Sequence, residues 1–253
     1  MVASILSVKD VRKSFGNLHA LDGITLDVSE KKISILIGPN GSGKTTLINV
    51  ISGLYAPDAG KIIFEERDVT GIPPYKLYSM GMARTFQIPA LFWKLTVLEN
   101  LLIAEKRNPG ESFLKSLLKR FWKDSEQRAM EKASRILDLL GLSRVWDQPA
   151  YYLSGGQMKL VEIGRALMSD AKLLLLDEPV SGVNPTLAHE IFSRILKLRD
   201  ELGITFFIVE HRLDVALKYV DEIFAMALGK LIASGLPDEV MNDKKVIEAY
   251  LGG

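Results

Sequence analysis

The sequence predicts an α/β fold with a mainly parallel β-sheet, an antiparallel β subdomain at the N-terminus and an inserted helical subdomain. Apolar runs of strand length alternate with helical patterns over residues 173–227, as expected for parallel β/α units. The first ~30 residues alternate apolar and polar side chains around turn signals at 15–17 and 22–23, which is typical of antiparallel strands. Apolar residues between 96 and 142 repeat at helical spacing, which indicates the inserted block.

Local signals predict the elements of the first half of the chain. An apolar run at 33–37 is expected to form a strand, a helix follows at 45–52, and a β segment at 61–64 follows the turn 57–60. Gly141 is placed to end a helix of the helical block. The apolar face of that helix comprises Ala129, Ala133, Ile136, Leu137 and Leu140.

The second half returns to alternating strands and helices. Asn184 and Pro185 predict the start of a helix over 186–202, and Gly203 predicts its end. The other predicted elements are strands at 173–176, 204–209 and 222–227 and a helix near 213–219.

Composition excludes several classes of function. The chain has 253 residues, a formal net charge of +1 and no cysteine. The charge gives no electrostatic bias toward nucleic acid, so we expect no nucleic-acid partner. The absence of cysteine excludes disulfides, thiol catalysis and cysteine–zinc sites, and it agrees with a reducing cytosol. No apolar run approaches the ~20 residues that span a bilayer, and no secretory signal is visible, so we expect a soluble protein.

The strongest functional signal is a glycine-rich segment between the strand 33–37 and the helix that follows it. It fits the phosphate-loop pattern and consists of Gly38, Pro39, Asn40, Gly41, Ser42, Gly43, Lys44 and Thr45. Glycines let successive backbone N–H groups point at one anion, and the helix N-terminus adds positive potential. We expect Lys44 to reach the terminal phosphates, Thr45 to bind Mg²⁺, and Thr46 to lie beside them. The segment predicts binding of a nucleoside triphosphate.

Two acidic residues follow the apolar run 173–176. At the carboxyl end of a strand beside a phosphate loop, Asp177 is expected to hold Mg²⁺ through water. Glu178 is expected to polarise the water that attacks the γ-phosphate. The alternative is a core strand that leaves the sheet through a polar turn.

The segment Leu153–Gln157 opens a helical pattern over 158–168. Ser154 is a suitable N-cap, and Gly155 and Gly156 allow backbone N–H groups to approach a phosphate closely, with Gln157 next to them. An ordinary helix-opening turn would show the same five residues.

Two further polar residues lie next to predicted strands. Gln87, at the junction between the β part and the helical block, has a neutral amide that can touch Mg²⁺ or the attacking water. His211 directly follows the strand 204–209, at the sheet edge that carries the other candidate residues. We interpret both as catalytic, although a lone histidine is more often structural.

These segments together resemble the nucleotide-binding subunit of ABC transporters. The resemblance rests on the phosphate loop, Gln87, Leu153–Gln157, Asp177 with Glu178, and His211, in this order. It implies ATP and Mg²⁺ as ligands, ATP hydrolysis coupled to transmembrane transport, and a homodimer or heterodimer that encloses two ATP molecules. Each ATP would lie between the phosphate loop of one subunit and Ser154, Gly155, Gly156 and Gln157 of the other.

The resemblance also implies how the chain is organised and placed. It implies a single ATPase domain, in which 1–87 and 169–253 form the nucleotide-binding core and 88–168 forms the helical subdomain. Phe15 matches the aromatic residue that stacks on adenine. The loop Ser181–Asn184 matches the segment that touches the opposite subunit, although an aspartate is commoner at the position of Asn184. The expected location is cytoplasmic and peripheral, on the inner face of the cell membrane beside integral membrane permease subunits.

A narrower resemblance is to the ATPase subunits of branched-chain amino-acid importers. It rests on the segment 91–101 and the insertion after it, on Gly182–Pro185 and on the ending 246–252. ATPases that power lipopolysaccharide export share the ending and much of the rest. Soluble ABC ATPases of iron–sulfur cluster assembly remain an alternative without transport. The two classes differ after Gln87, where a transporter needs a groove for a membrane subunit, and the apolar segment 88–93 could line such a groove or be buried.

One amphipathic stretch has no assigned role. Its apolar stripe consists of Phe113, Leu114, Leu117, Leu118, Phe121 and Trp122, and its basic face of Lys115, Lys119, Arg120 and Lys123. A basic amphipathic helix can lie on an anionic membrane surface. We favour packing of the stripe against protein, because amphipathic core helices are far commoner.

Overall fold

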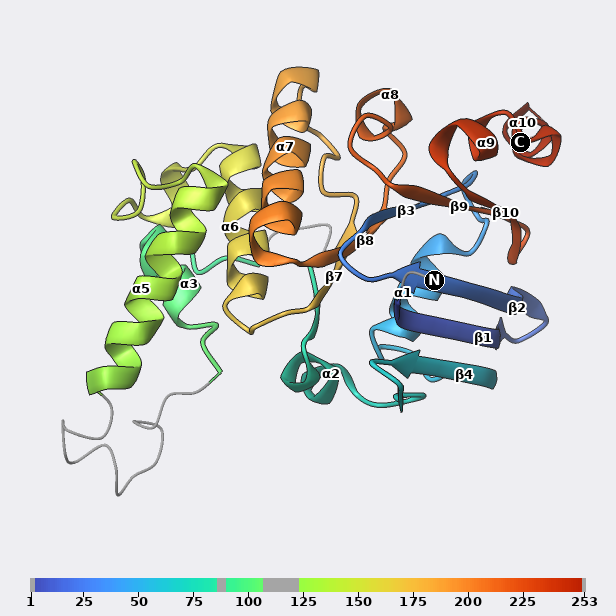
Figure 1. Ribbon diagram of the computed structural model, residues 1–253, viewed down its shortest axis with the longest axis horizontal. Helices are drawn as coiled ribbons and strands as arrows, with labels where there is room; N and C mark the ends of the chain where they lie inside the picture. The colour runs from blue at the N-terminus through green and yellow to red at the C-terminus, as the bar shows by residue number, and fades with distance from the viewer. Residues whose placement is uncertain (1–2, 86–89, 107–122, 252–253) are drawn as a thin grey trace. The chain divides into compact units, whose positions relative to one another are not determined.

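The computed structural model describes residues 3–85, 90–106 and 123–251. The chain divides into two compact units (Figure 1), one formed by 1–87 with 172–253 and the other by 88–171. Of the predicted features, Gln87 and all of the amphipathic stretch except Lys123 lie outside the described residues. No helix in the described ranges is long and apolar enough to cross a membrane.

The first unit begins with a four-stranded antiparallel sheet of order β2-β1-β4-β5. Its strands are β1 (Ser4–Phe15), β2 (Leu18–Ser29), β4 (Ala59–Phe64) and β5 (Arg67–Asp68). Alternating side chains of β1, such as Leu6 and Val8, are fully buried, because one face of an antiparallel sheet packs on the core while the other meets water. The predicted N-terminal antiparallel segment is confirmed.

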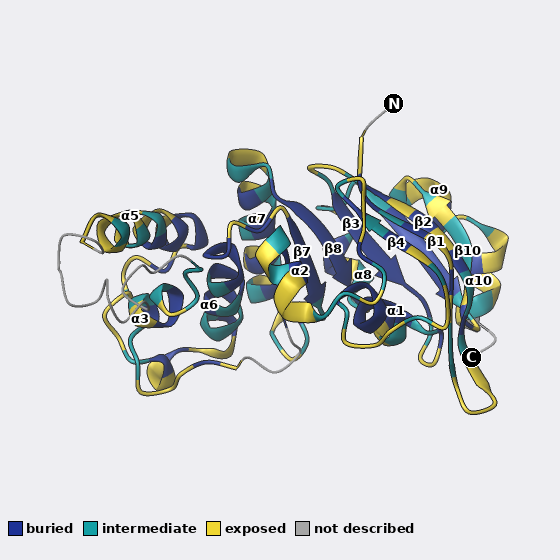
Figure 2. Cartoon of the chain, turned by 90° about the horizontal axis from the view of Figure 1, so that it is seen from below, coloured by how far each residue is buried: buried dark blue, intermediate teal, exposed yellow. Residues whose placement is uncertain are grey.

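The second sheet of this unit has six strands in the order β10-β9-β3-β8-β7-β6. They are β3 (Ile33–Ile37), β6 (Met82–Arg84), β7 (Leu173–Asp177), β8 (Thr205–Val209), β9 (Glu222–Ala227) and β10 (Lys230–Gly235). All neighbouring pairs are parallel except β9 with β10. The strands β3 and β8 are buried along their whole length (Figure 2), as continuous apolar runs require. The strands β6 and β10 were not predicted, because β6 is only three residues long and β10 lacks a clear alternation.

Three helices in the described part of the first unit match helices that the sequence predicts, at 44–51, 185–202 and 213–216. The helices described in this unit are α1 (Lys44–Ile51), α2 (Pro74–Met80), α7 (Pro185–Leu202), α8 (Leu213–Ala216), α9 (Pro237–Met241) and α10 (Lys244–Leu251). The Asn184 side chain accepts a hydrogen bond from Leu187 N at 2.9 Å, and Gly203 ends α7 with φ of 66°. The predicted ends of α7 are confirmed, whereas α8 is shorter than the helix predicted at 213–219.

The second unit is helical in its described part. Its elements are α3 (Val97–Leu102), α5 (Lys123–Leu140), the 3₁₀ turn η3 (Ala150–Tyr152) and α6 (Gly155–Leu167). The predicted apolar face of α5 is buried at 133, 136, 137 and 140, and Ala129 is half-buried. Gly141 follows with φ of 72°, and Leu142 N bonds to Leu137 O at 2.8 Å, which satisfies the helix end as predicted.

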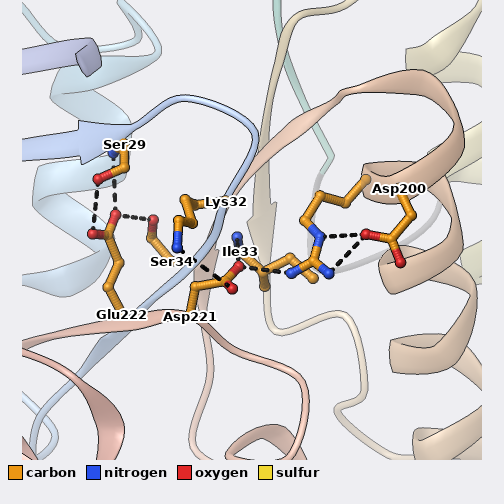
Figure 3. Close-up of polar contacts among 8 residues, drawn as sticks. Ser29, Lys32, Ile33, Ser34, Asp200, Asp221 and Glu222 are labelled. Carbon is orange, nitrogen blue, oxygen red and sulfur yellow. Dashed lines mark hydrogen bonds and ion pairs between the residues drawn. The ribbon is translucent and has the colours of Figure 1, made fainter. Parts of the chain in front are cut away.

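A polar network joins the antiparallel sheet to the parallel sheet at the start of β9 (Figure 3). Glu222 accepts hydrogen bonds from Ser29 N at 3.1 Å and from the hydroxyls of Ser29 and Ser34 at 3.0 and 2.6 Å. Asp221 accepts from Ile33 N and from Arg199 Nη1, each at 2.8 Å. These two carboxylates therefore fix the amino-terminal ends of the parallel strands and leave the opposite, carboxyl edge to the candidate site.

Candidate functional site

The phosphate loop connects the end of β3 to the start of α1 and packs closely against neighbouring strands. Gly38 has φ of 151°, and a Cβ on it would lie 2.2 Å from Met226 O. Gly43 has φ of 101°, and a Cβ there would lie 2.5 Å from Ala20 O. Both positions require glycine, because a side chain would collide with backbone that cannot move aside.

The Lys44 side chain lies folded within this loop. Its ammonium donates hydrogen bonds to Gly38 O at 2.8 Å and Pro39 O at 2.9 Å, and the residue is 5% exposed. Burial lowers the pKa of Lys44, and the negative charges of Glu178 and Asp177 act in the opposite direction. Phosphate oxygens can replace the two carbonyls as acceptors and would supply the counter-charge that the carbonyls lack.

A cavity of about 420 Å³ opens beside the loop. Its walls come from the phosphate loop, the β1–β2 and β9–β10 hairpins and the carboxyl edge of the parallel sheet. The predicted residues among them are Asn40, Gly41, Ser42, Gly43, Lys44, Thr45, Thr46, Glu178 and His211. The structure therefore brings most of the predicted phosphate-loop residues together with two predicted catalytic residues.

Two hairpins form part of the cavity wall, which was not predicted, although the first of them was predicted as antiparallel strands. They contribute Leu18, His19, Ala20, Leu228 and Gly229. Gly229, in the turn of the β9–β10 hairpin, contacts both the first hairpin and the phosphate loop. Its carbonyl accepts from Asp22 N at 2.8 Å, and its N–H donates to Ser42 O at 3.1 Å. The turn signal at 15–17 locates the first hairpin in the sequence, but it does not indicate that the hairpin faces the phosphate loop. The turn predicted at 22–23 is wrong, because Asp22 and Gly23 lie inside β2.

Glu178 and His211 meet at the carboxyl ends of the neighbouring strands β7 and β8. The distance from His211 Nε2 to Glu178 Oε1 is 3.4 Å. Glu178 has a positive φ of 50°, and its N–H bonds to Val209 O at 2.9 Å. A left-handed conformation is costly for a residue with a side chain, so the surrounding contacts must hold it there.

Asp177 is paired with an arginine that the sequence analysis missed. Arg84 lies at the end of β6, and its Nη2 is 3.1 Å from Asp177 Oδ2. Its Nη1 donates to Asn49 Oδ1 at 2.6 Å and to Ser52 Oγ at 2.9 Å. Asp177 is not among the residues that line the cavity.

The donor set fits Mg²⁺ in its chemistry. Thr45 offers a hydroxyl oxygen and Asp177 a carboxylate, which are hard oxygen ligands. Among the described residues there is no cluster of three or more histidine, cysteine, aspartate or glutamate side chains that could hold a metal alone. A magnesium ion bound here would therefore depend on phosphate oxygens and water for its remaining ligands.

Phe15, which matches the adenine-stacking aromatic residue, lies at the end of β1 and is 45% exposed. Its ring meets Tyr55 edge-on with centroids 5.5 Å apart, and Lys13 Nζ lies 5.7 Å from the ring centre. Phe15 does not line the cavity, so its contact with adenine stays a prediction.

The segment that precedes α6 forms a reciprocal cap in the second unit. Ser154 Oγ accepts from Gln157 N at 3.3 Å, and Gln157 Oε1 accepts from Ser154 N at 2.9 Å. Apart from its chain neighbours and its own helix backbone, no described residue has an atom within 4 Å of the position where a Cβ on Gly155 would stand. The predicted N-cap is confirmed, and the role of this segment toward a second subunit stays a prediction.

Comparison with known proteins assigns the family. A family model described as "ABC transporter" matches residues 21–181. The chain belongs to the ABC transporter family. A second model, described as "Branched-chain amino acid ATP-binding cassette transporter", matches residues 230–253 of this family member.

Individual members of the ABC transporter family match nearly the whole chain. The probable branched-chain amino acid transport ATP-binding protein LivG of Methanocaldococcus jannaschii is 50% identical over 252 residues, covering 98% of this chain and 97% of that protein. A crystal structure of the ADP conformation of an ATP-binding cassette of an ABC transporter has a TM-score of 0.85 and 47% identity, covering 99% of this chain and 100% of that chain. A dimeric cassette in a post-hydrolysis state bound to ADP and Pi has a TM-score of 0.73 and 26% identity, covering 92% and 98%. The predicted family and fold class are confirmed.

Proposed function

We propose that this chain is the ATP-hydrolysing subunit of an ABC transporter that imports branched-chain amino acids. The observation that carries the proposal is the shared cavity in which Lys44 faces the pair formed by Glu178 and His211. The match over 230–253 and the relatives named for branched-chain amino acid transport support this substrate class over lipopolysaccharide export or iron–sulfur cluster assembly.

Each part of the cavity has a separate chemical task. The phosphate-loop amides and Lys44 bind and orient the triphosphate, which is the main requirement of phosphoryl transfer. Glu178 accepts a proton from the attacking water as the bond between the γ-phosphorus and the bridging oxygen of ADP breaks. His211, 3.4 Å away, orients the Glu178 carboxylate and can donate to the γ-phosphate. Mg²⁺, held by Thr45 and Asp177, would neutralise phosphate charge when bound.

The partners follow from the same proposal. A second ATPase subunit would complete the ATP site with its Ser154–Gln157 segment, and membrane permease subunits would carry the amino acid. In the segment expected to meet a permease, Leu91 is buried, whereas Phe92 and Trp93 are 47% and 50% exposed. The two exposed aromatic side chains support contact with a partner. Contact with permease subunits would hold the chain at the inner face of the membrane.

Purification of the tagged chain from membranes tests the proposal. We expect two multi-spanning subunits and a solute-binding protein to co-purify, and ATP hydrolysis by the complex to rise when the binding protein carries leucine. The matched control is the same complex with the binding protein free of solute. Stimulation by a solute other than a branched-chain amino acid, and none by leucine, would contradict the substrate assignment.

Replacing Ser154 by arginine is expected to leave ATP binding by the monomer unchanged and to block hydrolysis. The arginine side chain, which is larger and positively charged, would stand where the second subunit's nucleotide must approach. Within its own subunit Ser154 is exposed and caps α6. Nucleotide titration and phosphate release measure the two effects. Ser154→Thr keeps the cap and serves as the control. Normal turnover by an ATP-bound dimer of the arginine variant would contradict the shared site.

Replacing His211 by alanine is expected to lower turnover by about tenfold or more while the dissociation constant for ATP changes little. The imidazole lies beside Glu178, whereas the Lys44 ammonium bonds to Gly38 O and Pro39 O. Turnover of the folded fraction and a thermal melt separate the two effects. A lowered melting temperature with unchanged turnover would assign His211 a structural role only.

A further inference from the structure

A buried glutamate lies directly between β8 and the catalytic histidine. Glu210 is 1% exposed, and its own N–H bonds to Leu36 O at 3.4 Å, at the end of β3. A carboxylate this deeply buried must find hydrogen-bond donors, because the cost of removing a charge from water is otherwise not offset. The proposed chemistry gives Glu210 no contact with nucleotide, so its burial needs another explanation.

The two carboxylate oxygens of Glu210 bond to two different loops. Oε1 accepts from Val180 N at 3.1 Å, two residues after Glu178. Oε2 accepts from His211 N at 2.7 Å and from Arg212 N at 3.2 Å. One side chain therefore connects the backbone that follows Glu178 to the backbone of the turn that carries His211.

A second contact joins the same two loops further along. Arg212 Nη1 donates to Val183 O at 3.1 Å, in the loop Ser181–Asn184. Within the loop itself, Ser181 N donates a hydrogen bond to Glu178 O at 3.1 Å. The loop that begins at Glu178 is thus attached to the His211 turn at Val180 and again at Val183.

We propose that Glu210 is a positioning residue that sets the distance between Glu178 and His211. Glu178 stands in a left-handed conformation with φ of 50°, which does not persist without support from its surroundings. Val180 supplies that support through Glu210, and the same carboxylate fixes the His211 backbone. The inference rests on the proposed ATP hydrolysis, because it assigns a role toward the two residues that carry it.

Glutamine at position 210 separates this role from simple packing. The amide has nearly the shape of the carboxylate but has one acceptor oxygen and a donating NH₂ group. Whichever way it turns, either Val180 N or the pair His211 N and Arg212 N faces another donor. Glu210→Gln therefore breaks the connection between the loops while it keeps most of the side-chain volume.

Glu222→Gln is the matched control. Glu222 also binds a backbone N–H and neighbouring groups through both oxygens, but it lies at the opposite, amino-terminal end of the parallel strands. The same chemical change there removes comparable hydrogen bonds and leaves the Glu178 and His211 loops untouched. Any effect common to both variants reports on stability rather than on positioning.

The test compares the full-length wild type, Glu210→Gln and Glu222→Gln under one set of conditions. We expect Glu210→Gln to lower kcat for ATP hydrolysis by about tenfold to a hundredfold, since small misplacements of catalytic groups have effects of this size. Its dissociation constant for ATP should stay within about twofold of wild type, because Lys44 and the phosphate loop are unchanged. Glu222→Gln should hydrolyse ATP at nearly the wild-type rate per folded molecule.

Hydrogen exchange supplies a readout that does not depend on activity. The amides of Val180, His211 and Arg212 should exchange faster in Glu210→Gln and at the wild-type rate in Glu222→Gln. If Glu210→Gln does not fold, Arg212→Ala tests the same loop through Val183 and should lower kcat with ATP affinity retained. Equal turnover by Glu210→Gln and Glu222→Gln, or by wild type and Arg212→Ala in the second case, would overturn the inference. Absence of hydrolysis by wild type would instead overturn the proposed function.

Discussion

Replacing Glu178 by glutamine is expected to reduce ATP hydrolysis by about a hundredfold or more and to trap an ATP-bound dimer. The amide keeps the shape of the carboxylate but cannot accept the proton of the attacking water, which removes general-base catalysis. Lys44 and the phosphate-loop amides still hold the triphosphate, so binding continues while the step that should separate the subunits is blocked. Phosphate release measures the first effect, and size-exclusion chromatography with light scattering in ATP and in ADP measures the second.

Glu222→Gln is again a suitable control for Glu178→Gln, because it makes the same chemical change away from the cavity. It should remain active and should not accumulate as a dimer. Hydrolysis at the wild-type rate by Glu178→Gln would exclude Glu178 as the base. Binding of ATP without hydrolysis and without dimerisation would retain the chemistry and point to a different ATPase subunit as the partner.

Replacing Lys44 by alanine is expected to weaken ATP binding by about tenfold to a hundredfold or more. The change removes the ammonium that would otherwise exchange its bonds to Gly38 O and Pro39 O for phosphate oxygens. A hydrogen bond to a charged group contributes ~1.5–3 kcal/mol, and the lysine is expected to make more than one to the phosphates. Calorimetric titration with ATP measures the loss.

Lys172→Ala is the control for the lysine variant. Lys172 pairs with Glu65 on the surface of the same unit, and exposed ion pairs contribute little to stability. ATP affinity should therefore stay at the wild-type value in Lys172→Ala. Equal affinities for Lys44→Ala and Lys172→Ala would contradict the assigned role of the phosphate-loop lysine.

Residues whose position depends on neighbours in the chain were predictable from the sequence. The phosphate loop needs a strand, a glycine-rich turn and a helix in immediate succession, and all three signals lie within 33–52. Asp177, Glu178 and His211 were predictable because the carboxyl ends of parallel strands meet at one edge of a sheet. The ends of α7 were predictable from local signals, because a cap residue and a stop residue each act within one turn of the helix.

Other parts of the site were not predictable from local signals. Arg84 and Asp177 are 93 residues apart in the chain and meet only because β6 and β7 are neighbours in the sheet. The β6 strand itself is too short to give a periodic signal. Leu228 and Gly229 line the cavity because β10 folds back on β9 and carries their turn to the phosphate loop.

The sequence by itself determined that this protein has a phosphate loop, a buried strand ending in two acids and a histidine after the next strand. Only the tertiary structure decided that the Glu178 loop and the His211 turn share one buried carboxylate. Glu210 in the sequence is one acidic residue among 31 aspartates and glutamates. Its proposed role depends on the hydrogen bond that Val180 N, 30 residues earlier in the chain, donates to Glu210 Oε1 at 3.1 Å. Side-chain periodicity reports which face of an element is buried, but it carries no information about which donor on another element a buried charge will meet.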